Sequence, residues 1–272
     1  MAMPELPEVE TIVRDLRRQL PGRRIERVEL MERRVLRTAP QRLARSLEGA
    51  TVNAVERYGK NIVVQVTKGR SLFWWIHLGM TGRLTCERAG APRRRHTHAV
   101  FLLDSGEELR YTDMRQFGRM AVSGEWPSGL QELGPDPLEI SQRDFVAALR
   151  TRRARVKALL LNQRFLRGVG NIYSDESLFR AGIHPAALGS RISPVRAAAL
   201  HRALQRVLHE AIHGRGSSVR DYVDGRGEAG RFQFEHRVYG RAGEPCLKCG
   251  TRLSRTLVAG RGTTFCCHCQ KR

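Results

Sequence analysis

Four cysteines near the C-terminus constrain the fold of this chain more than any other feature. They stand as two C-x2-C pairs with sixteen residues between the pairs: Cys246, Cys249, Cys266 and Cys269. In a four-cysteine zinc ribbon, each such pair brings two thiolates to one ion, and a hairpin joins the pairs. We therefore expect one structural Zn2+, whose binding stabilises a C-terminal unit, residues 244–272, that is too small to fold without metal.

The other cysteines, Cys86 and Cys267, lie outside this pattern, and we expect them to be thiols of a cytoplasmic protein. The sequence has no run of about 18 apolar residues that would span a membrane. Met1-Ala2-Met3 leads directly into acidic residues and prolines, so no signal peptide is predicted. We expect a monomer that does not interact with membranes.

The net charge of +21 points to a polyanionic partner. Of the 48 basic residues only five are lysines. Arginine binds phosphate through two parallel hydrogen bonds and stacks on bases, so this composition favours a nucleic acid. The alternative is a compositional bias of the genome that carries no information about the partner.

Residues 24–122 consist mainly of short β-branched and aromatic segments separated by Gly, Asn, Asp or Ser. Seven such segments predict a β-sandwich or barrel: Arg24–Leu30, Thr51–Glu56, Asn61–Thr67, Leu72–Leu78, His98–Leu103, Leu109–Thr112 and Arg119–Val122. A second helix is expected over Ala39–Leu47. The first helix, at the N-terminus, has apolar residues at the spacing of one buried face: Val9, Ile12, Val13, Leu16 and Leu20.

Prolines and glycines in residues 124–140 predict a linker, beyond which the pattern becomes helical. Helices are expected at Ser141–Arg150, Arg155–Gln163, Asn171–Ala181 and Ser193–His213. Residues 214–243 have few apolar anchors and are too many for a simple connection, so they are either disordered or a functional loop. The expected fold class is α+β, with a strand-rich first domain and a helical second one.

Several short motifs are candidates for contacts with phosphate or bases. Gly168-Val169-Gly170-Asn171 opens a helix, where free backbone N–H groups bind phosphate, although a plain turn has the same pattern. Arg261, between glycines, projects from the turn of the ribbon hairpin. The turn Asp113–Gly118 offers Arg115 and Phe117 for insertion into a duplex, and the similar turn His77–Gly82 has Met80 at its tip. Each motif also has a purely structural interpretation, as core or as surface charge.

Taken alone, Pro4-Glu5-Leu6-Pro7-Glu8 indicates only a well-capped helix start. Together with the other motifs, it resembles the N-terminus of bacterial formamidopyrimidine-DNA glycosylases. The matching segments follow in the order of that family: Tyr58-Gly59-Lys60, His77–Gly82, Asp113–Gly118, residues 168–179, and the cysteine ribbon with Ala259-Gly260-Arg261-Gly262-Thr263. The resemblance covers essentially the whole chain.

The resemblance implies a catalytic β-sandwich domain with flanking helices (1–123), a linker (124–140), a helix-two-turns-helix domain (141–243) and the zinc ribbon (244–272). Double-stranded DNA with oxidised purines or abasic sites would lie in a basic cleft between the domains. Residues 214–239 would cover the flipped base as a lesion-recognition loop. The implied activity is excision of 8-oxoguanine and formamidopyrimidines followed by β,δ-elimination, in the bacterial cytoplasm and at the nucleoid.

The resemblance also implies roles for individual residues. The catalytic group is Pro4, Glu5, Lys60 and Arg261. The residues expected to contact DNA are His77, His98, Met80, Arg115, Phe117, Lys157 and Asn171. The residues expected around the base are Glu8, Glu176, Ser217 and Tyr239.

The implied chemistry depends on Pro4 as a free N-terminus. An α-amino group titrates at about 8 and lysine at about 10.4, so much more of the former is unprotonated at neutral pH. Its attack on the sugar C1′ expels the base and leaves an iminium, the electron sink that Schiff-base lysines also provide. Glu5, the next residue, would donate a proton to the opening sugar ring and move protons during elimination.

Met1-Ala2 before Met3-Pro4 departs from the family, in which proline directly follows the initiator methionine. We predict that translation starts at Met3 and that removal of Met3 exposes Pro4. If Ala2 were retained, the nitrogen of Pro4 would be an amide and no nucleophile would exist.

Two other functions fit parts of the sequence. An enzyme similar to endonuclease VIII would prefer oxidised pyrimidines, but Leu6-Pro7 and the long 214–239 loop argue against it. A catalytically inactive, zinc-dependent protein that binds damaged DNA would share the charge and the ribbon and would need no free N-terminus. Tight binding to abasic DNA without nicking would identify such a protein.

Overall fold

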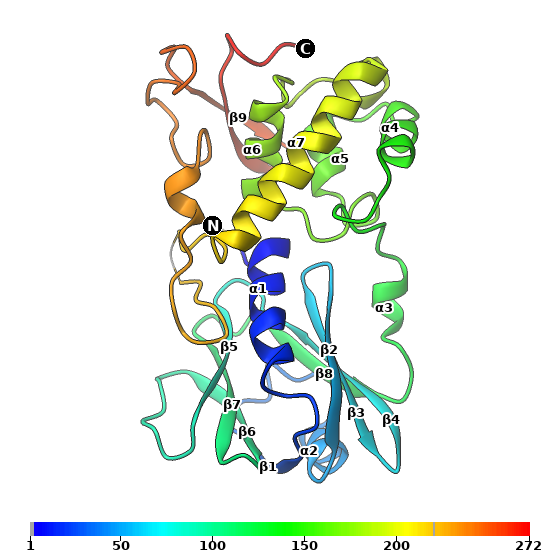
Figure 1. Ribbon diagram of the computed structural model, residues 1–272, viewed down its shortest axis with the longest axis vertical. Helices are drawn as coiled ribbons and strands as arrows, with labels where there is room; N and C mark the ends of the chain where they lie inside the picture. The colour runs from blue at the N-terminus through cyan, green and yellow to red at the C-terminus, as the bar shows by residue number, and fades with distance from the viewer. Residues whose placement is uncertain (1–2, 220) are drawn as a thin grey trace. The chain divides into compact units, whose positions relative to one another are not determined.

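The computed structural model describes residues 3–219 and 221–272 (Figure 1). Its contacts divide the chain into two compact units. The first unit extends to Glu132 and also includes Gly214–Arg231, whereas the second comprises Leu133–His213 and Phe232–Arg272. The segment 214–239, which the sequence analysis placed in the second domain, is therefore divided after Arg231, and its larger part belongs with the first unit.

The first unit contains two antiparallel four-stranded sheets (Figure 1). One sheet has the order β1 (Ile25–Leu30), β6 (Thr97–Leu103), β7 (Glu107–Asp113), β5 (Gly82–Arg88). The other has the order β2 (Thr51–Tyr58), β3 (Asn61–Lys68), β4 (Arg70–His77), β8 (Arg119–Ser123). Buried side chains of both sheets form one core, in which the rings of Trp74 and Phe101 lie with their centroids 4.4 Å apart. The predicted β-sandwich is confirmed.

The sequence analysis missed strand β5, and it also predicted no helix within the linker, where residues 128–131 form one. Strand β5 has only one large aliphatic residue, Leu84, between charged and small residues, so the segment after Gly82 gives a weak strand signal. Among the described strands, β5 lies at a sheet edge and pairs with β7 alone. A single partner strand, distant in sequence, thus decides its conformation.

Helix α1 (Leu6–Arg17) has the predicted buried face: four of the five apolar residues of the pattern lie on it, and all five are fully buried, but the helix ends before Leu20. Glu5 is the N-cap residue, and the Glu8 side chain accepts its backbone N–H in a capping box. The unit is completed by helix α2 (Pro40–Leu47) and the short helix α3 (Ser128–Gln131).

The second unit is a helical cluster with one hairpin (Figure 1). Its helices are α4 (Gln142–Arg150), α5 (Val156–Leu161), α6 (Asn171–Arg180) and α7 (Pro194–His213), with short 3-10 turns at Gly189–Arg191 and Phe232–Glu235. All four predicted helices are present, although α5 ends earlier than predicted because Asn162 has an extended backbone. Helix α7 packs against α4 and α6. No helix in residues 3–219 and 221–272 is long and apolar enough to cross a membrane.

The hairpin consists of β9 (Ser254–Val258) and β10 (Arg261–Phe265), which pair in antiparallel register. Ala259 and Gly260 form its two-residue turn, both with positive φ. A tight turn of this kind matches the twist of the two strands. The predicted ribbon hairpin therefore places Arg261 directly after the turn.

Candidate active site and metal centre

Pro4, Glu5 and Glu8 lie at the N-terminus of α1, in the first unit. Pro4 is buried, and Glu5 and Glu8 are each 2% exposed. The backbone N–H of Glu5 donates to Glu8 Oε2 at 2.9 Å. The free N–H groups of a helix start carry partial positive charge, so this position favours carboxylates and anionic ligands. The capping box with Glu8 therefore fixes the position of Glu5, the residue directly after Pro4.

Glu8 also holds residues 216–217, although the two segments are far apart in sequence. Ser217 donates its backbone N–H to Glu8 Oε1 at 2.8 Å, so each carboxylate oxygen has one backbone partner. Gly216 has a φ of +84°, which suits glycine, and a Cβ there would lie 3.0 Å from Glu8 Oε1. Two residues expected around the base, Glu8 and Ser217, are therefore in direct contact.

Lys60, His77 and Arg119 form a group of hydrogen-bond donors at one end of the β2-β3-β4-β8 sheet. Lys60 lies in the turn before β3, where Asn61 is paired with His77, and His77 is paired in turn with Arg119. Burial, with the nearby cations Lys60 and Arg119, lowers the pKa of His77 to about 4. His77 is therefore neutral at pH 7.

The tautomer of His77 follows from its neighbour. The backbone N–H of Gly79 donates to His77 Nδ1 at 3.1 Å, so the ring proton is on Nε2, which can donate to an anion. Arg119 was missed by the sequence analysis. Arg119 is identified only by its pairing with His77 across two neighbouring strands, and the sequence does not reveal which residues pair.

The turns at 78–81 and 113–118 are held together by Asp113, which is fully buried. Asp113 Oδ1 accepts from the Thr81 hydroxyl and, at 3.2 Å, from the backbone N–H of Arg115. Asp113 Oδ2 accepts from the backbone N–H of Gly118 at 2.8 Å. A Cβ on Gly79 would lie 2.5 Å from Gly118 N, so the two turns touch through backbone.

Met80, Arg115 and Phe117 are carried by these two turns. The Arg115 guanidinium lies over the Phe117 ring, 4.5 Å from its centroid, a cation–π arrangement. The Phe117 side chain is 47% exposed, which is unusual for phenylalanine. The three residues that the sequence analysis expected to enter a duplex are therefore on adjoining turns.

His98 lies beneath these turns and is only 6% exposed. Its Nε2 is 2.7 Å from the backbone carbonyl oxygen of Asp113, so the ring donates there. The sequence analysis expected His98 to contact DNA. In the structure the ring is instead nearly enclosed, and its Nε2 supports the turn that carries Arg115.

Lys157 requires a similar correction, because it is fully buried in the second unit and does not face outward. Its Nζ lies 2.6 Å from Asp175 Oδ1 and donates to Thr263 Oγ1 at 2.8 Å and to the Gly262 carbonyl at 3.2 Å. A buried ammonium needs such a full set of partners. Lys157 thus ties helices α5 and α6 to strand β10 of the hairpin.

Asn171 and Arg261 come together through the same strand. Asn171 Nδ2 donates to the Gly262 carbonyl at 3.0 Å, next to Arg261. Asn171 is the first residue of α6, and the N-terminus of a helix carries partial positive charge that favours an anion. Arg261 is exposed at the tip of the hairpin. The predicted helix start and the predicted arginine finger are therefore neighbours.

Glu176 and Tyr239, expected around the base, are also joined. Glu176 is fully buried, and its Oε1 accepts the backbone N–H groups of Arg237, Val238 and Tyr239 at 2.8–3.0 Å. Burial raises the pKa of Glu176 above its ordinary value, because it outweighs these three hydrogen bonds, which act in the opposite direction. Because its carboxylate is enclosed, Glu176 shapes the turn at 237–239, and Tyr239 is the more accessible of the two.

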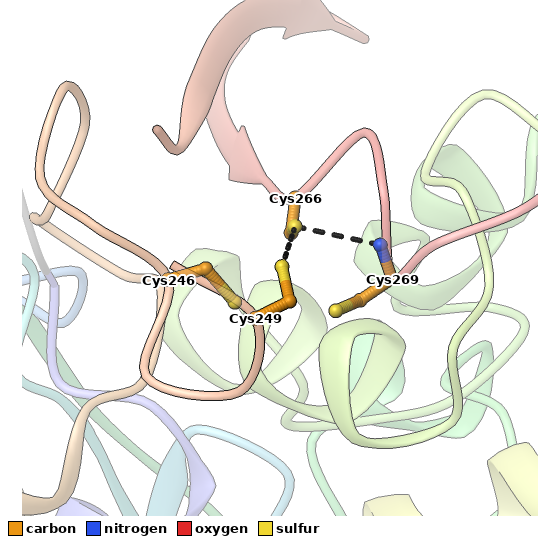
Figure 2. Close-up of side chains that lie close together, drawn as sticks. All are labelled: Cys246, Cys249, Cys266 and Cys269. Carbon is orange, nitrogen blue, oxygen red and sulfur yellow. Dashed lines mark hydrogen bonds between the residues drawn. The ribbon is translucent and has the colours of Figure 1, made fainter. Parts of the chain in front are cut away.

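The four predicted zinc ligands converge in the second unit. The sulfur atoms of Cys246, Cys249, Cys266 and Cys269 lie within 4.8 Å of one another, and Figure 2 shows them turned toward a common centre. The backbone N–H groups of Lys248 and Cys269 point at the sulfurs of Cys246 and Cys266, 3.4 Å away. Four thiolates in this arrangement suit tetrahedral Zn2+ and fill its coordination sphere. Such a zinc is structural.

The fold and these residues define a class of protein. A β-sandwich with a proline–glutamate helix start and paired turns, followed by a helical unit with a zinc ribbon, is the architecture of the helix-two-turns-helix DNA glycosylases. Sequence profiles match along the chain: the formamidopyrimidine-DNA glycosylase N-terminal domain at residues 3–120, its H2TH domain at 133–223, and the zinc finger found in FPG and IleRS at 243–272. The chain belongs to the formamidopyrimidine-DNA glycosylase family.

Individual relatives agree over their full length. The formamidopyrimidine-DNA glycosylase of Solibacter usitatus is 53% identical over 271 residues, which cover 99% of this chain and all of the relative. A Lactococcus lactis variant solved with Fapy-dG-containing DNA is 34% identical, with a TM-score of 0.91 over 99% of this chain and 100% of that one. The Lactococcus lactis enzyme with abasic DNA gives 34% identity and a TM-score of 0.90 over 98% and 100%.

Proposed function

We propose that this protein is a bifunctional DNA glycosylase and abasic-site lyase that removes oxidised purines through the imino nitrogen of Pro4. The observation that carries the proposal is the Pro4-Glu5 pair at the start of α1, in a chain similar over its whole length to glycosylases solved with Fapy-dG and abasic DNA. The net charge of +21 supports a DNA substrate.

In the proposed reaction, the lone pair of the Pro4 nitrogen attacks C1′ of the damaged nucleotide. The C1′–N9 bond breaks, and the base leaves with its electron pair and takes up a proton. Glu5 protonates the ring oxygen as the sugar opens, which leaves an iminium between Pro4 and C1′. Loss of a C2′ proton then expels the 3′ phosphate, a further elimination expels the 5′ phosphate, and water releases Pro4.

This route requires that no residue precede Pro4 in the active enzyme. We propose that translation begins at Met3 and that the methionine is removed. The family match beginning at residue 3 supports this start. In a chain that retained Ala2, the Pro4 nitrogen would carry no available lone pair for attack.

The remaining site residues bind and position DNA in this proposal. The Lys60, His77 and Arg119 group would bind one stretch of phosphates, with His77 as a neutral donor. Asn171 and Arg261 would bind phosphate on the second unit. Met80, Arg115 and Phe117 would fill the space that the flipped nucleotide leaves. The bound zinc would hold the ribbon so that Arg261 keeps its place.

The test is trapping with borohydride, which reduces an iminium to a stable amine. The wild-type protein should form a covalent complex with a duplex that contains 8-oxoguanine, and Pro4→Gly or Glu5→Gln should abolish it. Glu26→Gln, an exposed change on β1, serves as the control. Trapping that survives both site changes would refute the assigned roles. A panel of substrates with oxidised pyrimidines tests the endonuclease VIII-like alternative.

We further propose that the protein is located in the cytoplasm, at the nucleoid.

A further inference from the structure

Residues 214–219 and 221–231, the described part of this segment, contain no helix or strand, yet they are bonded to the rest of the first unit at several points. The two ends of the segment are closed on each other, because the backbone N–H of Arg231 donates to the Gly214 carbonyl at 2.7 Å. Inside the closed loop, the Ser218 hydroxyl accepts from the backbone N–H of Gly230 at 2.8 Å. The segment is therefore a single closed loop with its own hydrogen bonds.

An ionic triad of one half-buried arginine and two buried carboxylates joins this loop to helix α1. Asp15, on α1, is 1% exposed, and its Oδ2 lies 2.5 Å from Arg215 Nη2. Arg215 Nε donates at 2.6 Å to Oδ2 of Asp224, which is fully buried. The guanidinium thus bridges one carboxylate of the helix and one of the loop. We call Asp15, Arg215 and Asp224 the triad.

Asp224 in turn fixes the far side of the loop. Its Oδ1 accepts the backbone N–H groups of Arg226 and Glu228 at 2.9 and 3.0 Å. Gly225 lies against the helix so closely that a Cβ there would be 2.9 Å from Asp15 Cβ. Its carbonyl accepts from the backbone N–H of Cys86, on β5, at 3.2 Å. The triad therefore holds the loop where its backbone meets both α1 and the sheet.

Arg215 adopts φ +59, a conformation in which arginine is strained and glycine is not. The ion pairs to Asp15 and Asp224 compensate for that strain. Two residues further on, Ser217 donates its backbone N–H to Glu8 beside the Pro4-Glu5 start of α1. Between Ser217 and Asp224 in the sequence, Tyr222 packs against the core and donates its hydroxyl hydrogen to the Glu8 carbonyl at 3.3 Å.

We propose that the triad is a lock that holds the 214–231 loop in register with Glu8, and that it sets the preference of the enzyme for base-containing over abasic DNA. The proposal rests on the proposed function. A duplex with a damaged base offers the loop a base to contact, whereas an abasic site offers none. Displacing the loop should therefore slow base release and spare strand scission at a preformed abasic site. Asp15, Arg215 and Asp224 are positioning residues, since they act through the loop.

The experiment measures two single-turnover rates for each variant: base release from an 8-oxoguanine duplex and scission of a preformed abasic duplex. Asp15→Asn keeps the shape of the side chain and removes its charge, which leaves Arg215 and Asp224 with an incomplete partner set. We expect base release to fall about tenfold or more and abasic scission to change less than about twofold. Asp104→Asn, in the exposed β6–β7 turn, makes the same charge change on the same unit and should alter neither rate.

Arg215→Gly is the second variant, because glycine suits the positive φ and the change removes the side chain that makes both ion pairs. It should give the same split of rates even if Asp15→Asn folds poorly. Backbone hydrogen exchange should become faster in residues 216–231 of both variants and remain unchanged in α7. Equal loss of both rates, or no loss in either variant, would overturn the lock. A wild-type protein that cannot release the base at all would instead refute the proposed function.

Discussion

Thr81 donates its hydroxyl hydrogen to the buried carboxylate of Asp113, and this bond joins the turn that carries Met80 to the turn that carries Arg115 and Phe117. The same carboxylate accepts backbone N–H groups from both ends of the second turn. An exposed aromatic side chain such as Phe117 can insert into a duplex only if the turn that carries it is rigidly supported. Asp113 supplies that support from inside the protein.

Thr81→Val should uncouple the two turns. The change removes the hydroxyl and keeps the shape, so one lone pair of a buried carboxylate loses its partner, at a cost of about 1–3 kcal/mol. We expect a lower midpoint of urea unfolding and weaker binding to a duplex with an abasic analogue. Thr67→Val, at an exposed position of β3, is the control. An unchanged Thr81→Val variant would mean that Asp113 holds the turns without Thr81.

Arg115→Ala should reduce discrimination between damaged and undamaged DNA. The guanidinium stacks on Phe117 and would pair with the base left behind when a nucleotide flips. We expect the affinity for an abasic duplex to fall by about 1–3 kcal/mol and the affinity for undamaged duplex to fall less. Fluorescence anisotropy at one fixed salt concentration measures both. Arg70→Ala, at an exposed position of β4, is the control and should lower the affinity for both duplexes equally or not at all.

Removal of zinc should abolish DNA binding through the second unit. The hairpin that carries Arg261 has little core of its own, so its folding depends on the metal. We expect one zinc per chain by elemental analysis, and loss of both zinc and activity in Cys249→Ser. Cys267→Ser is the matched control, because Cys267 lies between two ligands and outside the sulfur cluster. Equal zinc loss in both variants would refute the four-ligand assignment.

The stability of the second unit should fall in mild acid through His236. Burial lowers the pKa of His236 to about 4, whereas an unfolded histidine titrates at about 6.5. Between these values the unfolded chain binds a proton that the folded chain does not, so the free energy of unfolding decreases as the pH falls. From pH 7 to 5 the expected loss is about 2 kcal/mol.

His236→Gln should remove this contribution and flatten the dependence of unfolding on pH, measured by thermal denaturation with excess zinc. His209→Gln, on the exposed side of α7, should keep the wild-type slope. Identical slopes in wild type and His236→Gln would show that His236 is not buried in its neutral form.

The features that the sequence predicted well depend on neighbours close in the chain. The zinc ligands follow from two local pairs, and the buried face of α1 follows from helical spacing. The misplaced residues depend on distant partners. Lys157 is buried because Asp175 and the hairpin enclose it, and His98 because it meets the Asp113 carbonyl.

Other features could not be found from one sequence at all. Strand β5 forms because it pairs with β7. The position of Arg119 beside His77 depends on the register in which β8 pairs with β4. Asp15 and Arg215 are 200 positions apart, and neither belongs to a recognisable motif. Long-range ion pairs of this kind are set by the fold, so only the structure reveals them.

The measurement that tests the central claim most directly is the mass of the peptide that crosslinks to DNA after borohydride reduction. The protein should be purified from its natural host, so that its N-terminus is processed normally. The proposal predicts an N-terminal peptide that begins at Pro4 and carries the sugar remnant on its imino nitrogen. An active enzyme whose chain begins at Met1 or Ala2, or a sugar attached to a lysine, would contradict it.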